Sequence, residues 1–483
     1  MPDSATTTAR VPALWAEWRD RLKWLERIPP IGWVAILSLV LLGVYGTGYV
    51  GYNTSFTLVW AKQILNGHRP EFLIYQSPTP HPLTTYYCVL LSLLPGTIPL
   101  GVAGVLGLVF FAILGVVTFQ LGKRLFSTPV GLVFALIVLT RPRFVEQAQN
   151  ASVEIPWLAL IIGAAAMEAR RPKRGLPVLA LLGVAGLLRP ETWLLIGAYT
   201  LYLLPHRSLR ERITIVAAAL AAPVIWLVTD FILARDALFS LTHTQDVGEA
   251  TQTARGGLGA IRGAVSALGG ILHPAIVVGA AIGLVYVLRA DRRRAVLPLA
   301  LIVLGSVSFF AIGLSGLPTL SRFFFLPALV LALFCAVVVG GWRAEGVTGP
   351  RRPVELAVWG VLVLGALASL PLEASKLNNA DHYARTAQHF EVDLHTLVRN
   401  RVARGWIRRC PTVGFHTNRV RPFLDLWLGK PYPILEMENF VAAHGGLLFQ
   451  RPSDRDKFVV PPSFREVYRN RSWTMYERCG LRA

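Results

Sequence analysis

Glu154 is the residue whose type and position point most directly to chemistry. It opens an apolar run and Pro156 follows it, so the carboxylate is expected in the first turn of a helix at a membrane boundary. Ionisable groups at such a depth are candidates for function, and a carboxylate there can serve as a general base. The alternative is a carboxylate that only stabilises the helix start through the helix dipole. Glu71, in an earlier polar stretch, is the second candidate for the base.

Two arginines and a histidine could bind a substrate. Arg189-Pro190-Glu191 interrupts an apolar run, and its charged residues can either pair with each other or bind phosphate and orient a base. Arg322 opens a later apolar run, where it can extend to the interface or meet a lipid phosphate. His81 stands between Pro80 and Pro82, which stiffen the chain and present the imidazole at the bilayer surface. For His81, the alternative is an ordinary interfacial anchor.

The remaining polar residues give no comparable signal. Asp230 ends an apolar run, and a segment containing Asp236, His243, Asp246 and Glu249 follows, for which a solvated loop is expected. Their spacing matches no metal-ligand pattern, and the chain has no zinc motif, phosphate-binding glycine loop or dinucleotide fingerprint. The sequence therefore predicts neither a metal site nor a nucleotide, and it leaves open whether a divalent metal takes part.

The composition indicates what kind of protein positions these residues. Of 483 residues, 53% are hydrophobic and 16% are charged, whereas a soluble domain has about 25% charged residues. This excludes a single soluble domain and favours a protein with the bilayer as its solvent. The net charge of +20 lies mostly in short basic runs between apolar segments. That distribution indicates contact with membrane lipid rather than nucleic acid.

Eleven apolar segments are predicted to be transmembrane helices, and they lie near 32–51, 98–121, 128–141, 153–168, 175–188, 191–204, 212–231, 271–288, 295–313, 322–341 and 354–371. The polar residues 1–30 show no cleavage site and are predicted to be a cytoplasmic segment. With that orientation every dense basic run falls on the cytoplasmic side, as the positive-inside rule requires. These runs are 123–124, 170–174, 206–212, 289–294 and 342–352.

The predicted fold is therefore an all-α polytopic membrane domain over residues 31–371, followed by a small extracytoplasmic domain over 372–483. The outer face also receives the loops 52–97, 142–152 and 232–270. The C-terminal region contains short strand-like runs and an amphipathic helix candidate, which predicts an α/β domain. Cys410 and Cys479 both lie in it, and outside the cytoplasm we expect them to form a disulfide.

Four stretches together resemble the GT-C superfamily of polytopic membrane glycosyltransferases, the class of the protein O-mannosyltransferases and the lipid A aminoarabinose transferase. They are the helix end Ile64–Gly67, the segment Pro80–Tyr87, the span end Leu121–Phe126 and the acidic-x-Pro entry Glu154–Pro156. The resemblance covers about residues 30–205. Beyond these residues it rests on the plan of many spans followed by an outer domain.

The resemblance implies an enzyme of a bacterial-type plasma membrane that moves a sugar from a polyprenyl-phosphate donor to an acceptor glycan, lipid or protein on the outer face. Glu154 and Glu71 would then be catalytic, and Arg189, Glu191, His81 and Arg322 would bind substrate. The family's base is an acid just after the first span. This chain departs from that pattern, because residues 43–56 contain no acid and the expected position falls near Asn53 to Ser55.

Two alternatives stay open. A non-catalytic membrane protein of the same fold would explain the missing first-loop acid. A lipid or solute transporter would place charged residues deep within the spans, whereas here the charges stand at the ends of the apolar runs.

Overall fold

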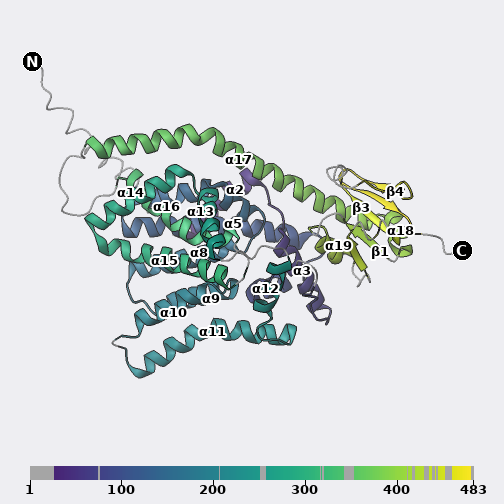
Figure 1. The fold of residues 1–483 in the computed structure, drawn as a ribbon, viewed down its shortest axis with the longest axis horizontal. Coiled ribbons are helices and arrows are strands. Elements are labelled where there is room, and N and C mark those ends of the chain that lie inside the picture. The colour runs from purple at the N-terminus through teal and green to yellow at the C-terminus, as the bar shows by residue number, and fades with distance from the viewer. Residues whose placement is uncertain are drawn as a thin grey trace, which may run out of the picture.

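The computed structural model describes residues 27–73, 77–205, 207–250, 257–315, 317, 320–341, 353–410, 412–415, 419–428, 434–437, 441, 444–451 and 459–479. A large helical bundle fills one end of the molecule and a small sheet the other, with one long helix running between them (Figure 1). This confirms the predicted fold class. Most of the predicted cytoplasmic segment 1–30 lies outside the described residues.

Helices form over the apolar runs because a chain in lipid must satisfy its backbone hydrogen bonds within each segment. All eleven predicted segments overlap a helix. The helices that carry them are α2 (Pro30–Tyr45), α5 (Ile98–Leu125), α6 (Thr128–Thr140), α8 (Glu154–Arg170), α9 (Leu176–Leu188), α10 (Thr192–Leu203), α11 (Leu209–Ala234), α14 (Pro274–Ala290), α15 (Arg292–Leu314), α16 (Phe325–Val339) and the start of α17 (Pro353–Arg399).

The number of complete spans differs from eleven. Among the described helices, four are long and apolar enough to cross a membrane, namely α5, α11, α15 and the continuous stretch 321–339. The count rises to six if each of two bent helix pairs is one span. Several other apolar helices, such as α9 with 13 residues and α10 with 12, fall short of the roughly 20 residues that a span needs. Eleven full spans are therefore not confirmed.

The predicted outer loops are largely helical. Loop 52–97 contains α3 (Tyr52–Leu65) and α4 (Pro82–Leu91), and loop 142–152 contains α7 (Pro142–Gln149). Loop 232–270 contains α12 (Phe239–Ala250) and most of α13 (Gly257–Ile271), which meets α14 at a bend of 103°. A short 3-10 helix, η2 (Ser321–Phe324), precedes α16. These short helices border the candidate site.

Two glycines bring the first outer loop against the chain that follows α7. Gly48 has φ +68°, and a Cβ there would lie 2.5 Å from the carbonyl oxygen of Gln149. A Cβ on Gly51 would lie 2.8 Å from the carbonyl oxygen of Asn150. The backbones are also hydrogen-bonded, because Tyr49 N–H donates to Gln149 O at 2.7 Å. Only glycine permits both close approaches, so α3 has a fixed position beside α7.

The long helix α17 joins the bundle to the C-terminal domain and crosses the predicted boundary at 371/372 without a break. Along its length Glu373 pairs with Arg141 at 3.1 Å, and Asp381 accepts a hydrogen bond from Gln149 at 3.1 Å. Further on, Trp473 of the C-terminal domain donates its indole N–H to the carbonyl of Phe390 at 2.9 Å. The helix is therefore attached to both parts of the molecule.

The C-terminal domain consists of a mixed five-stranded sheet and the helices α18 (Arg401–Arg409) and α19 (Arg421–Leu428). The strands are β1 (Thr412–Phe415), β2 (Ile434–Met437), β3 (Leu447–Gln450), β4 (Arg465–Arg469) and β5 (Thr474–Glu477). Their order in the sheet is β2-β1-β3-β5-β4, with β1 parallel to β2 and β3 and with β5 antiparallel to β3 and β4. The predicted disulfide between Cys410 and Cys479 is confirmed, with 5.4 Å between the Cα atoms.

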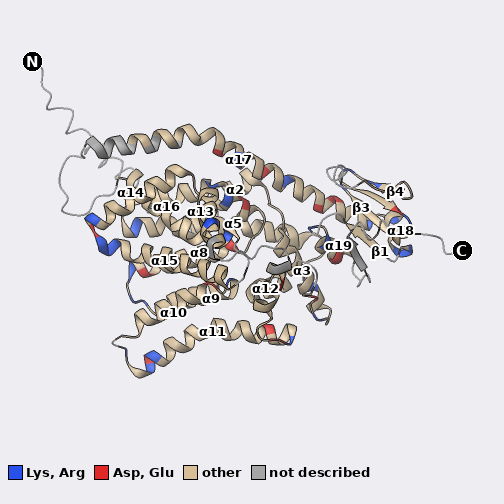
Figure 2. Ribbon diagram, in the orientation of Figure 1, with Lys and Arg blue, Asp and Glu red and all other residues tan. Residues whose placement is uncertain are grey.

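Basic residues gather at one end of the helical bundle. The turn between α14 and α15 carries four arginines within 289–294, and the start of α11 carries Arg210 and Arg212. Both groups lie at the end of the bundle away from the C-terminal domain (Figure 2). The candidate site described next lies nearer the other end, where the outer helices meet.

Candidate functional site

A cavity of about 1070 Å³ opens where the predicted outer segments converge. Its walls come from the start of α3, the stretch 77–81, the start of α8, the turn between α9 and α10, the ends of α11 and α15, α12 and η2. Glu154, Arg189, Glu191, His81 and Arg322 all line it. Five of the six site residues predicted from the sequence thus lie around one cavity, although they are spread over 242 positions of the chain (81 to 322).

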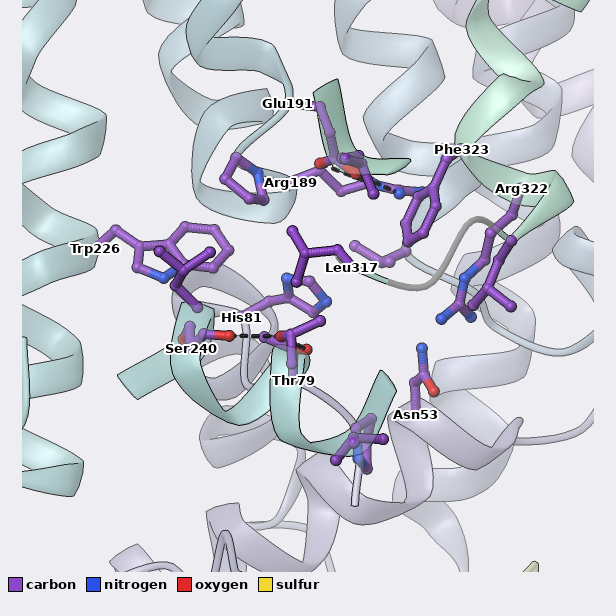
Figure 3. A pocket seen from close by; sticks show the side chains of 18 of the residues that line it. Asn53, Thr79, His81, Arg189, Glu191, Trp226, Ser240, Leu317, Arg322 and Phe323 are labelled. Atoms are coloured by element: carbon purple, nitrogen blue, oxygen red, sulfur yellow. Dashed lines mark hydrogen bonds and ion pairs between the residues drawn. The ribbon is translucent and has the colours of Figure 1, made fainter. Parts of the chain in front are cut away.

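Arg189 holds two carboxylates at one wall of this cavity. Its Nη2 lies 2.6 Å from Glu191 Oε1, and its Nη1 lies 3.2 Å from Glu154 Oε1. The second oxygen of Glu154 accepts a hydrogen bond from the Ser152 hydroxyl. The side chains of Arg189 and Glu154 are only 3% and 2% exposed. Buried charges persist when they are paired and hydrogen-bonded, as both are here. We name Glu154, Arg189, Glu191 and Arg322 the charged wall; Figure 3 labels the last three of these residues.

Two aromatic rings contact the Arg189 guanidinium. Its central carbon lies 4.9 Å from the centre of the Trp157 ring and 4.5 Å from that of Phe323. Trp157 is itself held, because its indole N–H donates to the Thr192 hydroxyl at 2.7 Å. A guanidinium stacks well on such rings because of their negative faces. With two ring contacts and ion pairs to two carboxylates, Arg189 is a rigid part of the wall.

Arg322 is the more accessible arginine of the charged wall. Its side chain is 32% exposed, and its Nε lies 3.4 Å from Glu154 Oε1, a charge contact that does not have the geometry of a hydrogen bond. Figure 3 shows its guanidinium directed into the cavity on the side of Asn53. Within the described part of the chain, no hydrogen bond engages its two Nη groups, so they are available to an anion.

His81 lies in the cavity as a neutral group. Its ring meets Trp226 edge to face with 5.6 Å between the ring centres. Burial, assisted by the positive charge of Arg189, lowers the pKa of His81 to about 3. Its Nδ1 is buried and has no hydrogen-bond partner among the described residues. His81 can therefore offer hydrogen bonds to a bound molecule, but it brings no charge at neutral pH.

A third carboxylate, that of Asp230, lines the cavity near the end of α11. Asp230 is buried and accepts hydrogen bonds from the backbone N–H of Ser240 at 3.0 Å and from its hydroxyl at 2.9 Å. Beside it, the hydroxyls of Thr79 and Thr244 lie 2.5 Å apart. His243 is buried too and lies 3.1 Å from the Ser77 hydroxyl. The prediction of a solvated segment is wrong for His243, since α12 folds back over the stretch 77–81.

We name Asp230, Ser240, Thr79, Thr244 and His81 the hydroxyl wall. The sequence did contain a signal that Asp230 belongs to a site, because Asp230 ends an apolar run. A carboxylate at the end of a membrane span is energetically costly unless other groups pair with it.

Glu71 does not reach the cavity. Its side chain is exposed, and its backbone carbonyl accepts the indole N–H of Trp60 at 3.1 Å while its N–H donates to Gln63 Oε1 at 2.9 Å. The neighbouring Phe72 packs against Trp60, with ring centres 4.9 Å apart. This packing directs the Glu71 segment away from the cavity, toward α19. No three His, Cys, Asp or Glu side chains of the described residues form a group that could hold a metal ion.

Residues 80–229 match the model of a family described as dolichyl-phosphate-mannose-protein mannosyltransferase. No curated protein sequence matches the chain. Among solved structures, the chain is similar in fold, over 89–95% of its length, to the proteins named in the next paragraph. This confirms at the level of the fold the resemblance found in the sequence.

Three solved structures show this similarity of fold. One is ArnT from Cupriavidus metallidurans, solved with bound undecaprenyl phosphate, which is 14% identical and has a TM-score of 0.53; the alignment covers 94% of this chain and 98% of that one. The apo form of the same protein has a TM-score of 0.51 at 13% identity, covering 95% and 98%. Another is the oligosaccharyltransferase of Archaeoglobus fulgidus in its apo form, 11% identical with a TM-score of 0.51, covering 89% of this chain and 70% of that one.

Proposed function

We propose that the protein is an integral membrane glycosyltransferase that takes a sugar from a polyprenyl-phosphate donor and passes it to an acceptor. The observation that carries this proposal is the 1070 Å³ cavity whose charged wall leaves one arginine, Arg322, open to an anion. The ArnT structure with bound undecaprenyl phosphate and the family match over residues 80–229 support the same donor class. A phosphate-linked sugar is already activated, so the reaction needs no nucleotide.

Arg322 is the proposed ligand of the donor phosphate. A guanidinium binds phosphate oxygens through parallel N–H groups, and the Nη groups of Arg322 face the cavity (Figure 3). Arg189 and Glu191 are assigned to substrate binding indirectly, because their mutual pairing at 2.6 Å fixes the wall against which the donor lies. His81 is proposed to hydrogen-bond the sugar or the phosphate through its unpartnered Nδ1.

Glu154 is the proposed general base. Thr54 donates a hydrogen bond to the carbonyl of Ala151 at 2.9 Å, which places the start of α3 beside the segment that leads into Glu154. The acceptor hydroxyl oxygen attacks the anomeric carbon, the bond from that carbon to the phosphate oxygen breaks, and the hydroxyl proton passes to Glu154. The phosphate keeps the bonding electron pair and leaves as polyprenyl phosphate on Arg322. The sugar is transferred with inversion.

The same proposal includes the orientation. With the arginines of 289–294 and of the α11 start on the cytoplasmic side, the C-terminal domain and the cavity lie on the outer face (Figure 2). The proposed location is a bacterial-type plasma membrane. A disulfide at Cys410–Cys479 fits an oxidising compartment. A reporter fused after Ala483 should be active only outside the cytoplasm, and cytoplasmic activity would overturn this orientation.

The test of the proposed donor is a binding and transfer measurement on the purified chain in lipid nanodiscs. We expect undecaprenyl phosphate to bind and Arg322→Gln to weaken binding about 10–100-fold, as loss of a charge-assisted phosphate contact typically does. Arg207→Gln is the matched control, because Arg207 is also 32% exposed but pairs with Glu211 at the far end of the bundle. Equal binding by wild type and Arg322→Gln would contradict the assignment.

A second candidate function is favoured by one residue. Asn53 lines the cavity near the position where the resemblance implies a catalytic acid, and an amide cannot accept the proton as a carboxylate does. A protein that binds the lipid phosphate without transferring sugar would keep the Arg322 site and lack turnover. Transfer by wild type, followed by mass spectrometry of the product, separates the two functions. If wild type is inactive while Asn53→Asp transfers sugar, the second candidate is correct.

A further inference from the structure

A second cavity of about 440 Å³ lies between the first outer loop, α17 and the C-terminal domain. Tyr52 and Arg419 line both this cavity and the larger one, so the two spaces share a wall. The segment after α7 also borders both, with Asn150 at the second cavity and Glu154 at the first. A molecule in the second cavity therefore lies next to the proposed base and donor.

Aromatic rings in fixed orientations surround the second cavity. Tyr49 and Tyr383 meet edge to face with 5.8 Å between ring centres, and Phe390 and Trp473 do so at 6.2 Å. Both pairs are held by hydrogen bonds, since Arg419 donates to the Tyr383 hydroxyl at 2.6 Å and the Trp473 indole N–H donates to the Phe390 carbonyl. The faces of such rings carry partial negative charge, so the C–H groups of a bound ligand can pack against them favourably.

Charged groups of both signs stand among these rings. Glu146 and Glu391 supply carboxyl oxygens, while Arg419 and Arg451 supply guanidinium groups. The Arg451 guanidinium lies 5.1 Å from the Phe390 ring centre, and the buried carboxyl of Glu391 accepts a hydrogen bond from the backbone of Val50. Burial raises the pKa of Glu391 well above its usual value, which favours a form able to donate a hydrogen bond.

This combination fits a polyhydroxylated molecule. Every sugar hydroxyl is both a donor and an acceptor, and a site with two carboxyls, two guanidiniums and the Asn150 amide can satisfy both roles. The Asn150 Oδ1 is buried and has no partner among the described residues.

A peptide acceptor fits less well. Extended peptides commonly bind by adding a strand to an open sheet edge. One edge strand of the C-terminal sheet is β4, and none of its residues lines the second cavity.

We propose that the second cavity is the acceptor subsite and that it binds a saccharide, whose reacting hydroxyl reaches Glu154 past Tyr52 and Arg419. This inference rests on the proposed function, because only a transferase has an acceptor. The binding of a saccharide at this place can nevertheless be measured without turnover.

The probe is a panel of methyl glycosides and free disaccharides, tested by saturation-transfer NMR on the full chain in lipid nanodiscs. We expect at least one saccharide to bind wild type and its signal to fall at least fivefold in Glu146→Gln and in Arg451→Gln. Glu466→Gln is the matched control: Glu146 and Glu466 are 38% and 41% exposed, each pairs with an arginine three positions away, and Glu466 lies on β4. Thermal melting checks that the variants are folded.

The outcomes separate this inference from the proposed function. Binding of undecaprenyl phosphate without any saccharide signal, or a saccharide signal that survives both variants, overturns the subsite. So does a Ser- or Thr-containing peptide whose binding Glu146→Gln abolishes. Saccharide binding with the expected loss, but no binding of undecaprenyl phosphate, supports the subsite and contradicts the donor. If transfer is found, Glu146→Gln should raise the acceptor KM at least fivefold and leave kcat within threefold.

Discussion

The charged wall and the hydroxyl wall of the large cavity each bury carboxylate, but they stabilise it by different means. Glu154 and Glu191 are held by the cations Arg189 and Arg322. Asp230 is held by a hydroxyl and a backbone N–H from Ser240, and no cation pairs with it among the described residues. The charged wall therefore stabilises its carboxylates with positive side chains, while the hydroxyl wall stabilises its carboxylate with neutral hydrogen-bond donors.

This difference assigns separate tasks to the two walls. The charged wall has two arginines against two carboxylates, and one of these arginines is loosely held, so an arriving phosphate can share it. The hydroxyl wall offers His81, Thr79 and Thr244, which are neutral groups suited to the hydroxyls of a sugar. The donor phosphate and the donor sugar would thus meet different surfaces of the same cavity.

Replacing Glu154 is expected to have the largest effect. Glu154→Gln keeps the shape and removes the proton acceptor, so we expect transfer to fall by about 10²–10⁴-fold, the usual effect of losing a general base. Initial rates with a polyprenyl-phosphate sugar donor measure it, and thermal melting confirms folding. A rate within threefold of wild type would remove Glu154 from the mechanism.

Arg189→Met should reduce stability most. It leaves the buried Glu154 and the partly buried Glu191 without their main partner, and breaking a buried ion pair from one side typically costs about 3–5 kcal/mol. A denaturation titration with SDS gives the free energy of unfolding. The double variant with Glu154→Gln should be more stable than Arg189→Met alone, because it removes one uncompensated charge. Simple additivity of the two losses would contradict the description of this wall as a coupled unit.

Phe323→Leu tests the aromatic support of the charged wall. The ring lies 4.5 Å from the Arg189 guanidinium carbon, and a desolvated cation–π contact contributes about 1–2 kcal/mol. The same SDS titration should show a loss of that size for Phe323→Leu. In an Arg189→Met background the loss should shrink, since the cation is absent. An undiminished loss would mean that Phe323 acts through packing alone.

Asp230→Asn should have the smallest effect on transfer. An amide keeps an oxygen that can accept from Ser240, and the hydroxyl wall is proposed to bind sugar rather than to take a proton, so we expect a rate within about threefold of wild type. The same donor assay measures it. A loss as large as that of Glu154→Gln would reverse the two walls and make Asp230 the base.

The sequence was sufficient for the features that depend on local pattern. Apolar runs located the helices, and the positions of Glu154, Arg189, Glu191 and Arg322 at the ends of those runs marked them as candidates. These four residues lie close together because the helix ends that carry them are on the same side of the helical bundle. The pairing of Arg189 with Glu191 was one of two stated possibilities, and the two-residue spacing made it available locally.

The features that the sequence did not reveal depend on contacts between distant segments. His243 looked like a solvated loop residue because its partner Ser77 lies 166 positions earlier in the chain. Glu71 looked close to the site because it lies in the same loop as His81. The packing of Phe72 on Trp60 turns that part of the loop away, and no periodic pattern in the loop encodes this turn.

The 47-residue helix α17 has a mechanical consequence. At 1.5 Å per residue it is about 70 Å long, a stiff lever with one end beside the bundle and the other in the C-terminal domain. Because the same helix lines the second cavity through Phe390 and Glu391, a tilt that widened that cavity would also swing its opposite end through the bilayer. Pro371 lies inside the helix and is a position where a bend could uncouple the two ends. As long as the helix stays straight, bilayer thickness would act on access to the second cavity.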